Sequence, residues 1–591
     1  MHEIELKFQV PPERRNAVAR ALAGRGASAH VRLAAVYFDT AGRALAAAGL
    51  GLRLRREGDH WVQTLKGAAV GGMTRAEHNV ARGDGVRAPA IEPALHAGTP
   101  VGDALLACLA DAAAAARKRA GSGAGAAPAA LAALLPRYRT EIDRLKRELA
   151  VRVPRGRVEL AFDAGRIVAG DTAVEVSEFE IEALAGSPLA VIATARRWVP
   201  RFGLWLDSRS KAERGDLLAR GKAMAPPRLA APVQLRRDMA ASQAWQTVLR
   251  SCAEQVIANA SQVASGEHAD EHVHQLRVGL RRLRSALQFL GDAPAGEALA
   301  APAAALFKSL GGARDRAVVE AEFGARLAAA RQAAGLEGGV PWPEAGAAEA
   351  PPAAGLRAPA SQLFLLDLLA AMHEGGHDDA LAAAAPANAL ANAAVYAAVN
   401  AAANAAANAA ANAASNAASN AASNAASNAA ANAASGPPPD PPVEAPLRDL
   451  LAQRLNRWHR QVTSGAKRFA ELDDAGRHRL RKRAKRLRYA AEFSASLFGA
   501  RRVRRYLKAL RRLQERLGAF TDVTMAMQVL APAAAPSVDA AADASANASA
   551  DAAAPPRFEL GWLAAQREPL VVAAAAELKA FARVERFWKR R

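Results

Sequence analysis

The period of the hydrophobic pattern changes once along the chain, and this change constrains the fold more than any other feature. Residues 1–220 contain short stretches in which apolar and polar residues alternate, such as VYFDT, GLRLRRE and VSEFEIEAL, and this period of two is typical of strands. After the stretch PPRLAAP, leucines recur every three or four residues, which is typical of helices. The pattern predicts a multidomain α+β chain with domains at 1–220 and 233–591, joined by a Pro- and Ala-rich linker at 221–232.

Glycine-containing turns divide the strand-rich part. EGD and DAGR are predicted as turns, so that VELAFD and GRIVAG count as separate strands. Asp163 begins the DAGR stretch. We interpret it as a turn former, with a position beside a metal ion as the alternative.

Low-complexity segments interrupt the helical part at about 333–360, 380–445 and 532–556. The second carries Asn at every fourth position from 400 to 432. This spacing allows an Ala-rich helix with a stripe of Asn, but we interpret the segment as an insertion without a function of its own.

The charge predicts a polyanionic partner. Among 591 residues, 78 Lys and Arg stand against 57 Asp and Glu, a net charge of +21, which suits nucleic acid, an acidic membrane or a phosphate polymer. Cys108 and Cys252 are the two cysteines, too few for a disulfide framework or a cysteine-based zinc site. No signal peptide or membrane span is predicted, so a cytoplasmic location is expected.

A basic motif occurs twice in the helical part. HQLRVGLRRLRSALQFL begins at His274, and HRLRKRAKRLRYAAEFSASLF begins at His478. Basic residues follow each histidine at the same offsets of three, seven and ten, which places them along one face of a helix. Both copies precede a Leu-Gly-x-x-x-Asp stretch, ending at Asp315 and at Asp522. The matching offsets indicate an internal repeat.

The density of positive charge in the second copy favours an anionic ligand over a merely solvated face. Residues 446–530 hold 22 Lys and Arg against 7 Asp and Glu. Like charges three or four residues apart on a helix repel each other, and an anion relieves that repulsion. Arg forks match phosphate oxygens and Lys supplies a point charge. The predicted anion-binding residues are His274, Arg277, Arg281, Arg284, His478, Arg481, Lys485 and Arg488.

This repeat resembles the CHAD family, the conserved histidine α-helical domain, over about 233–591 apart from the insertions. The resemblance implies an all-α bundle with pseudo-twofold symmetry, whose basic surface binds inorganic polyphosphate.

Charges of both signs also alternate along the predicted strands. The chain begins with Glu3, Glu5 and Lys7 on one face of HEIELKFQ. Several further strands show the same alternation. This suggests a barrel whose interior is lined with charged side chains, rather than several strands whose charged faces are exposed to solvent. In such a barrel cations would grip phosphate oxygens and carboxylates would hold a divalent metal. The further lining residues are Arg53, Arg55, Lys66, Arg75, Glu77, Arg144, Glu178, Glu180, Glu182, Lys211 and Arg214.

The Glu-x-Glu-x-Lys start, YFDT, the Arg-x-Arg strand, the Glu-x-Glu strand and SKAERG together resemble the CYTH family, the triphosphate tunnel metalloenzymes, over about 1–215. The resemblance implies an eight-stranded antiparallel β tunnel with flanking helices that binds triphosphate and a divalent metal. Asn79 departs from the family pattern, which often has an acid at that position, and this departure bears on metal preference.

Roles follow from the resemblance as a hypothesis. Lys7 and Glu5 are the predicted catalytic residues, with Lys7 polarising the phosphoryl group or its leaving oxygen. Mg²⁺ or Mn²⁺ is the predicted cofactor, held by Glu3, Glu5, Glu180 and Glu182. The predicted phosphate clamp consists of Arg53, Arg55, Lys66, Arg75, Arg144 and Lys211.

The combination is similar to bacterial CYTH-CHAD inorganic triphosphatases and implies metal-dependent hydrolysis of inorganic triphosphate, with polyphosphate bound by the helical domain and an association with polyphosphate granules. One alternative is a class IV-type adenylate cyclase or a thiamine or nucleoside triphosphatase on the same tunnel. Another is a non-catalytic polyphosphate-granule binding protein, which the intact charge motifs disfavour. Nucleic-acid binding is also disfavoured, because no RNP-like strand or zinc finger is present and aromatic residues make up only 5%.

Overall fold

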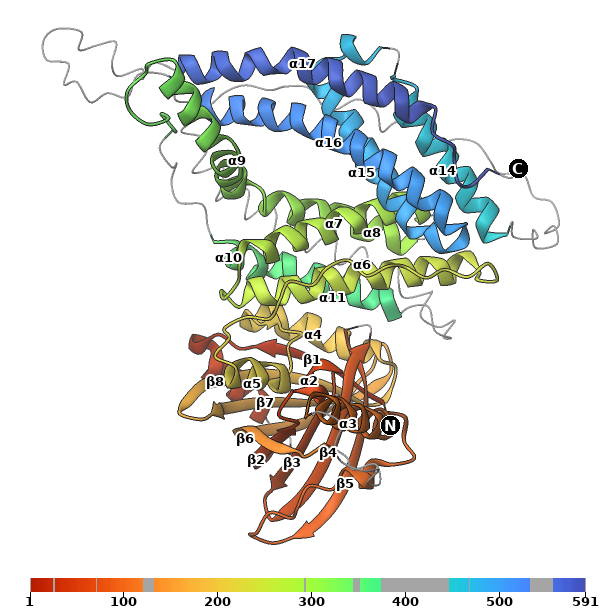
Figure 1. Cartoon of the computed structure of the whole chain (residues 1–591). Coiled ribbons are helices and arrows are strands. Elements are labelled where there is room, and N and C mark those ends of the chain that lie inside the picture. Colours follow the sequence, from red (N-terminus) through yellow and green to blue (C-terminus); the bar gives the residue numbers. More distant parts are fainter. Residues whose placement is uncertain are drawn as a thin grey trace, which may run out of the picture.

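A β-barrel and a stack of helices make up the protein (Figure 1). The computed structural model describes residues 2–24, 27–70, 72–120, 132–291, 294–343, 351–373, 446–466, 468–531 and 556–589. The predicted insertion at 380–445 lies outside these ranges. Residues 532–555 of the predicted insertion at 532–556 and residues 344–350 of the predicted segment 333–360 also lie outside them.

The barrel is closed and antiparallel. Its sheet order is β5-β4-β3-β2-β6-β7-β8-β1, and a further pairing of β1 with β5 closes the circle of eight strands. A short ninth strand adds to β1. The predicted eight-stranded antiparallel tunnel is therefore confirmed. The strands are β1 (His2–Gln9), β2 (Ala29–Asp39), β3 (Gly51–Glu57), β4 (His60–Val70), β5 (Thr74–Asp84), β6 (Leu135–Val151), β7 (Gly156–Ala169), β8 (Thr172–Gly186) and β9 (Trp205–Leu206).

One predicted turn is confirmed and the other is wrong. EGD forms the turn between β3 and β4, where Gly58 has a positive φ of 61°. DAGR instead lies inside β7, which is one continuous strand. A Cβ atom at Gly165 would lie 2.0 Å from the carbonyl oxygen of Glu141 on β6. The glycine therefore permits a close approach of two strands rather than a change of direction.

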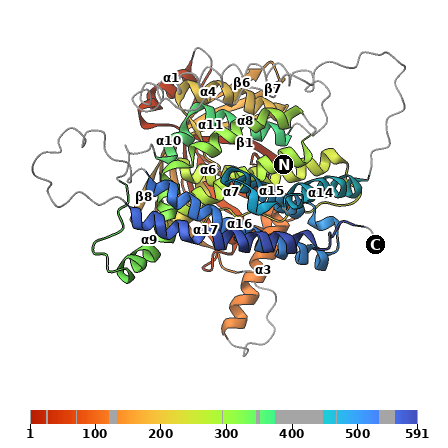
Figure 2. The same cartoon turned by 90° about the horizontal axis from the view of Figure 1, so that it is seen from above.

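In the described residues five α-helices flank the barrel, and α3 projects away from it (Figure 2). They are α1 (Arg15–Ala23), α2 (Ala44–Ala47), α3 (Pro100–Ala120), α4 (Leu189–Phe202) and α5 (Lys211–Ala219). A capping box fixes the start of α5: the Ser210 hydroxyl accepts from the Glu213 amide at 3.1 Å, and the Glu213 carboxylate accepts from the Ser210 amide at 2.7 Å. This cap places Lys211 as the first residue of the helix.

The second half is helical throughout its described residues, as predicted. Its helices are α6 (Ala241–Ala264), α7 (Asp270–Leu290), α8 (Pro294–Ser309), α9 (Gly312–Ala333), α10 (Pro352–Arg357), α11 (Pro359–His373), α14 (Leu447–Thr463), α15 (Asp474–Phe493), α16 (Ala500–Leu530) and α17 (Arg557–Ala582). Across the described part of the chain, no helix combines the length and the apolar character needed to cross a membrane.

The two copies of the basic motif form α7 and α15, which pack against each other. Apolar residues spaced three or four apart along each helix are buried in the core, because residues at this spacing share one helix face. These residues are Leu276, Leu280, Leu283 and Leu287 in α7, and Leu480, Ala484, Leu487 and Ala491 in α15.

Helix α4 joins the two halves. On one side it packs on β8, where Phe179 stacks on Trp198 with ring centroids 4.6 Å apart. On the other side it packs on α11, where Arg196 forms an ion pair of 2.5 Å with Asp367. One continuous hydrophobic core runs from the barrel through α4 into α6 and α11, so the barrel and the helices are packed together (Figure 1).

Candidate active site

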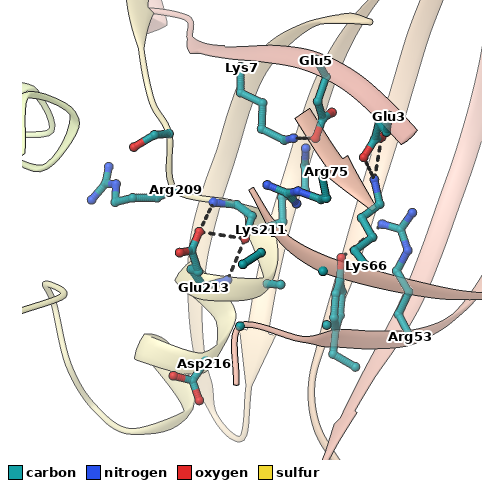
Figure 3. Close-up of a pocket in the computed structure, with 18 of the residues that line it drawn as sticks. Glu3, Glu5, Lys7, Arg53, Lys66, Arg75, Arg209, Lys211, Glu213 and Asp216 are labelled. Atoms are coloured by element: carbon teal, nitrogen blue, oxygen red, sulfur yellow. Dashed lines mark hydrogen bonds and ion pairs between the residues drawn. The ribbon is translucent and has the colours of Figure 1, made fainter. Parts of the chain in front are cut away.

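A cavity of about 1380 Å³ runs inside the barrel and reaches the connecting segment and α6. Its lining is strongly charged, with both signs present (Figure 3). Every residue predicted from the sequence for catalysis, metal binding and substrate binding in the tunnel lines this cavity: Glu3, Glu5, Lys7, Arg53, Arg55, Lys66, Arg75, Arg144, Glu180, Glu182 and Lys211.

The register of β1 and β8 explains how the charges meet. Glu5 lies opposite Glu182, and Lys7 lies opposite Glu180. Because side chains alternate across a strand, these four share the inner face of the barrel. The row continues to β7, where Glu159 lies opposite Glu182. Three carboxylates therefore stand side by side on neighbouring strands.

Lys7 donates to Glu5 in a buried ion pair (Figure 3). Burial disfavours the charged form of both side chains, but the attraction of nearby opposite charges is stronger than this effect. Glu5 and Glu180 raise the pKa of Lys7, and Lys7 and Lys66 lower the pKa of Glu5. Both groups are therefore ionised inside the barrel.

Lys66 connects two further carboxylates. Its Nζ lies 2.6 Å from Glu3 and 3.1 Å from Glu77. Burial opposes ionisation of Glu77, but Lys66 and the neighbouring hydrogen bonds lower its pKa to about 2. Asn79, where the CYTH pattern often has an acid, donates to Glu77 at 2.8 Å. The amide thus takes part in orienting Glu77.

The donor set around Glu182 fits a divalent metal. Burial, together with the charges of Glu3 and Glu5, raises the pKa of Glu182 to about 7, and burial and Glu5 raise the pKa of Glu3. The negative charge here exceeds what the nearby lysines balance, and carboxylate oxygens are the ligands that Mg²⁺ and Mn²⁺ prefer. Within the described residues no three His, Cys, Asp or Glu side chains already converge as a metal site.

Lys211 and Arg144 belong to a buried network rather than standing alone. Lys211 Nζ lies 2.7 Å from Glu180, 2.8 Å from Glu178 and 2.9 Å from Asp163. Arg144 holds Asp163 with two hydrogen bonds of 2.7 Å and also pairs with Glu180. Although burial acts against it, the pKa of Glu180 lies well below its ordinary value because of Lys211 and Arg144.

The interpretation of Asp163 as a turn former is wrong. Its side chain is 1% exposed and lies between Arg144 and Lys211. Sequence reasoning missed this role, and that of Glu159, because it divided β7 at DAGR. The spacing of four residues between Glu159 and Asp163 places both on the inner face of one strand, and this spacing was the available signal.

Three tunnel arginines keep an unpaired donor. The Nε atoms of Arg53, Arg55 and Arg75 are buried and have no hydrogen-bond partner among the described residues. Arg53 donates through Nη1 to the hydroxyl of Tyr37 at 3.2 Å, a lining residue that the sequence did not single out. Burial and the nearby Arg53 lower the pKa of Arg55 to about 10. Because buried polar groups are nearly always paired, these donors fit an anionic ligand in the cavity.

A second basic site lies between the repeated helices. In the first copy Arg277 donates to the carbonyl of Leu310 at 2.7 Å, and in the second Arg481 pairs with Asp522 at 3.1 Å. The two arginines thus contact equivalent Leu-Gly-x-x-x-Asp stretches, as the repeat predicts. The side chain of Asp315 lies outside the described part of the structure.

Positive charges from both copies face each other in this second site. Burial and the charges of Arg481 and Arg281 lower the pKa of Lys485 from 10.5 to about 7. The buried Nε atoms of Arg281, Arg481 and Arg488 have no partner in the described structure. Arg284 and Arg486 also face each other closely enough for Arg284 to contribute to a lowered Arg486 pKa, after burial. His478 is exposed and His274 is half-buried at the same offset.

Comparison with known proteins finds two domain families along the chain. A CYTH domain model matches residues 1–215 and a CHAD domain model matches residues 247–531. The CHAD domain from the plant Ricinus communis is 24% identical, with 62% of this chain and 99% of that chain covered and a TM-score of 0.39. The Hippeastrum protein HpAC1, for which a dominant triphosphatase activity is described, is 19% identical (38% and 98% covered, TM-score 0.23). The inorganic triphosphatase NE1496 is also 19% identical (32% and 77% covered, TM-score 0.13).

CYTH and CHAD matches together span most of the chain, in the order in which the barrel and the helices occur. The protein therefore combines a CYTH domain, built as a triphosphate-tunnel barrel, with a C-terminal CHAD domain.

Proposed function

We propose that the barrel hydrolyses inorganic triphosphate with a divalent metal, and that the helical half binds inorganic polyphosphate. The observation that carries the first part is the buried set of arginine donors without partners, Arg53, Arg55 and Arg75, which faces the same cavity as the carboxylate row of Glu5 and Glu182. Cations with unpaired donor atoms and crowded carboxylates in one cavity suit a phosphate chain bound together with a metal.

The residues of the tunnel divide into two groups in this proposal. Arg53, Arg55 and Arg75 contact phosphate oxygens directly, because each keeps a buried Nε donor without a partner. The other guanidinium nitrogens are partly engaged: Arg53 donates to Tyr37 and Arg55 pairs with Glu57. Lys211 and Arg144 hold Glu180 in place, because they are already engaged with buried carboxylates. Lys66 exchanges between Glu3 and the substrate, since a lysine ammonium has three donors.

Glu3, Glu5, Glu180 and Glu182 would hold the metal, Mg²⁺ or Mn²⁺, with Glu159 beside them. When bound, the ion supplies charge that stabilises the transferred phosphoryl group and its leaving oxygen. Lys7 lies beside Glu5 and opposite Glu180. The Lys7 ammonium would donate a hydrogen bond to the leaving phosphate, where negative charge develops.

In the helical half, the facing charges of Arg281, Arg481, Lys485 and Arg488 repel one another in the free protein. A polyanion that lies between α7 and α15 relieves this repulsion and pairs the buried Nε donors. A flexible phosphate chain suits this site better than duplex nucleic acid, because a thin chain can enter between two packed helices. An association with polyphosphate granules would follow from such binding.

A substrate panel tests the tunnel. Phosphate release from inorganic triphosphate, ATP and thiamine triphosphate would be measured with Mg²⁺ or Mn²⁺, together with formation of cyclic AMP from ATP. The proposal expects the highest kcat/KM with inorganic triphosphate. Preferred release from ATP or thiamine triphosphate, or formation of cyclic AMP, would replace it with the corresponding activity on the same tunnel.

Binding measurements test the helical half separately. Affinity for long-chain polyphosphate and for duplex DNA would be measured against salt, and both are expected to weaken as salt rises. The double variant Arg281→Ala/Arg488→Ala is expected to lose at least about tenfold in polyphosphate affinity. Unchanged affinity in this variant would show that polyphosphate does not bind between α7 and α15.

A further inference from the structure

The segment that connects the barrel to the helical half is hydrogen-bonded to helices α6 and α7. The Asn259 side chain on α6 accepts from the Arg228 amide at 3.1 Å and donates to the Arg228 carbonyl at 2.9 Å. His272 on α7 contacts the carbonyl of Ala225 at 2.9 Å. Two side chains of the helical half therefore fix the backbone of residues 225–228.

The Asn259 side chain is held in a single orientation. It is 1% exposed, and its amide nitrogen also donates to the carbonyl of Gln255 one turn earlier on α6. Both ends of the amide are therefore committed, which leaves one orientation for the side chain. A buried amide that pairs with both backbone groups of one residue fixes the position of that residue on the helix surface.

The fixed segment forms part of the wall of the tunnel cavity. We call the residues Ala225, Pro226 and Arg228 the lip. They line the same cavity as Glu3, Glu5 and Lys66, together with Glu254, Ile257 and Asn259 of α6. The rim of the barrel meets the helices here, since a Cβ atom on Gly72, in the β4–β5 turn, would lie 2.9 Å from Leu369 of α11.

The lip carries one cation, and its side chain is not buried. Arg228 is exposed while its backbone is held by Asn259. Arg228 is thus held beside a cavity that already contains several cations. Glu254 of α6 also lines the cavity, and its charge opposes an anion.

We propose that Arg228 contacts the outer phosphate of a phosphate chain bound in the tunnel, and that Asn259 is a positioning residue that holds Arg228 beside the cavity. This inference rests on the proposed triphosphatase function and assigns part of the substrate site to the linker and to the helical half. We take this contact to be equally strong in the ground state and in the transition state. Its loss therefore raises KM and leaves kcat unchanged.

Steady-state kinetics of the full-length chain with inorganic triphosphate and Mg²⁺ test this assignment. Arg228→Ala is expected to raise KM about fivefold at unchanged kcat, in keeping with an exposed charge-assisted contact. Arg228→Lys is expected to restore most of this loss. The matched control Arg236→Ala removes an arginine of the same connecting region that pairs with Asp238 at 3.2 Å and does not line the cavity, and it is expected to leave KM unchanged.

A double-variant comparison separates positioning from general stability. If Asn259 acts through Arg228, Asn259→Ala raises KM to a similar extent, and Arg228→Ala/Asn259→Ala is no worse than either single variant. An effect of Asn259→Ala that simply multiplies with that of Arg228→Ala would overturn the positioning role. An active wild type with unchanged KM in Arg228→Ala would overturn the lip assignment, whereas an inactive wild type would overturn the proposed function itself.

Discussion

Glu5 and Glu182 lie directly opposite each other on the neighbouring strands β1 and β8, with both side chains on the inner face of the barrel. Like charges at opposed positions of an antiparallel pair destabilise a sheet. Here the repulsion is part of why the pKa of Glu182 is raised to about 7, after burial. The fold therefore tolerates a destabilising pair at the position where a divalent cation would relieve it.

Substitution of Glu182 tests this relationship through stability. In a chelator, Glu182→Gln is expected to unfold about 2–4 °C above the wild type, because one like charge is removed. Mg²⁺ at about 100 times its Kd is expected to stabilise the wild type by about 2.7 kcal/mol, and most of this gain is lost in the variant. Thermal unfolding with and without the metal measures both effects. Glu175→Gln, on the same strand but 77% exposed and paired with Arg15, serves as the control that should respond like the wild type.

The division of the tunnel cations predicts two different phenotypes. Arg53→Ala removes an Nε donor that has no partner in the free protein, together with one hydrogen bond to Tyr37. We therefore expect kcat/KM to fall about 10- to 100-fold, with a loss of only about 1 kcal/mol in the free energy of unfolding. Arg144→Ala leaves buried carboxylates short of a partner, at a cost of about 3 kcal/mol in the free energy of unfolding. Kinetics and urea denaturation of both variants distinguish these outcomes.

Arg166→Ala provides the comparison for both, because Arg166 pairs with Glu141 on the outside of the barrel and is 58% exposed. Arg166→Ala should change neither kcat/KM nor the free energy of unfolding by more than experimental error. Equal stability losses in Arg53→Ala and Arg144→Ala would contradict the division into binding and positioning residues.

The sequence predicted the barrel, the helical half and most of the lining of the tunnel because each depends on local periodicity. Glu178 and Arg214, which were also predicted to line the tunnel, do not line the cavity. A period of two identifies the inner face of a strand, and the offsets of three, seven and ten identify one face of α7 and α15. What it did not predict depends on contacts between distant segments. From the sequence alone, Gly165 and Asp163 are predicted to lie in a turn. The structure shows that Gly165 lies against Glu141 of β6. It also shows that the Asp163 side chain lies between Arg144 and Lys211.

The linker is a second feature that the sequence did not predict, because it depends on contacts between distant segments. Its Pro- and Ala-rich composition predicts a spacer between two domains, and nothing local reveals that Asn259, some thirty residues later, binds the backbone of Arg228. Likewise, local spacing shows that Lys211 and Arg144 are cations of the tunnel, but only the packed structure shows that carboxylates already surround them.

Lys485 predicts a pH dependence of stability. Its pKa falls from 10.5 to about 7 on folding, through burial and the charges of Arg481 and Arg281, with Asp522 acting in the opposite direction. Between these two values the unfolded chain binds the proton more strongly, so the free energy of unfolding rises with pH from about 7 to 10.5. The destabilisation is fully present below pH 7.

Lys485→Met should therefore be more stable than the wild type at pH 6, with the difference fading toward pH 10. Urea denaturation at several pH values gives the result. Lys508→Met on α16, a lysine with an exposed side chain, is the control that should show no such trend. A constant difference between Lys485→Met and wild type across the range would contradict the lowered pKa.

Gly165 predicts the cost of a single methyl group. A Cβ there would lie 2.0 Å from the Glu141 carbonyl oxygen, so Gly165→Ala must separate β6 from β7 and is expected to cost at least about 2 kcal/mol in the free energy of unfolding. Gly42→Ala is the matched substitution, because no atom lies within 4 Å of its Cβ position, and it should change stability by less than about 0.5 kcal/mol. Equal stability of the two variants would contradict the close strand approach.

The most direct test of the account is metal-dependent phosphate release from inorganic triphosphate by the wild type, Glu5→Ala and the control Glu175→Gln. Glu5 pairs with Lys7 and lies opposite Glu182, so its removal disturbs both the proposed metal set and the proposed proton donor. The account predicts release by the wild type and the control only when Mg²⁺ or Mn²⁺ is present, and a rate at least about 100-fold lower for Glu5→Ala. Release by Glu5→Ala at the wild-type rate, or no release by the wild type with either metal, would contradict it.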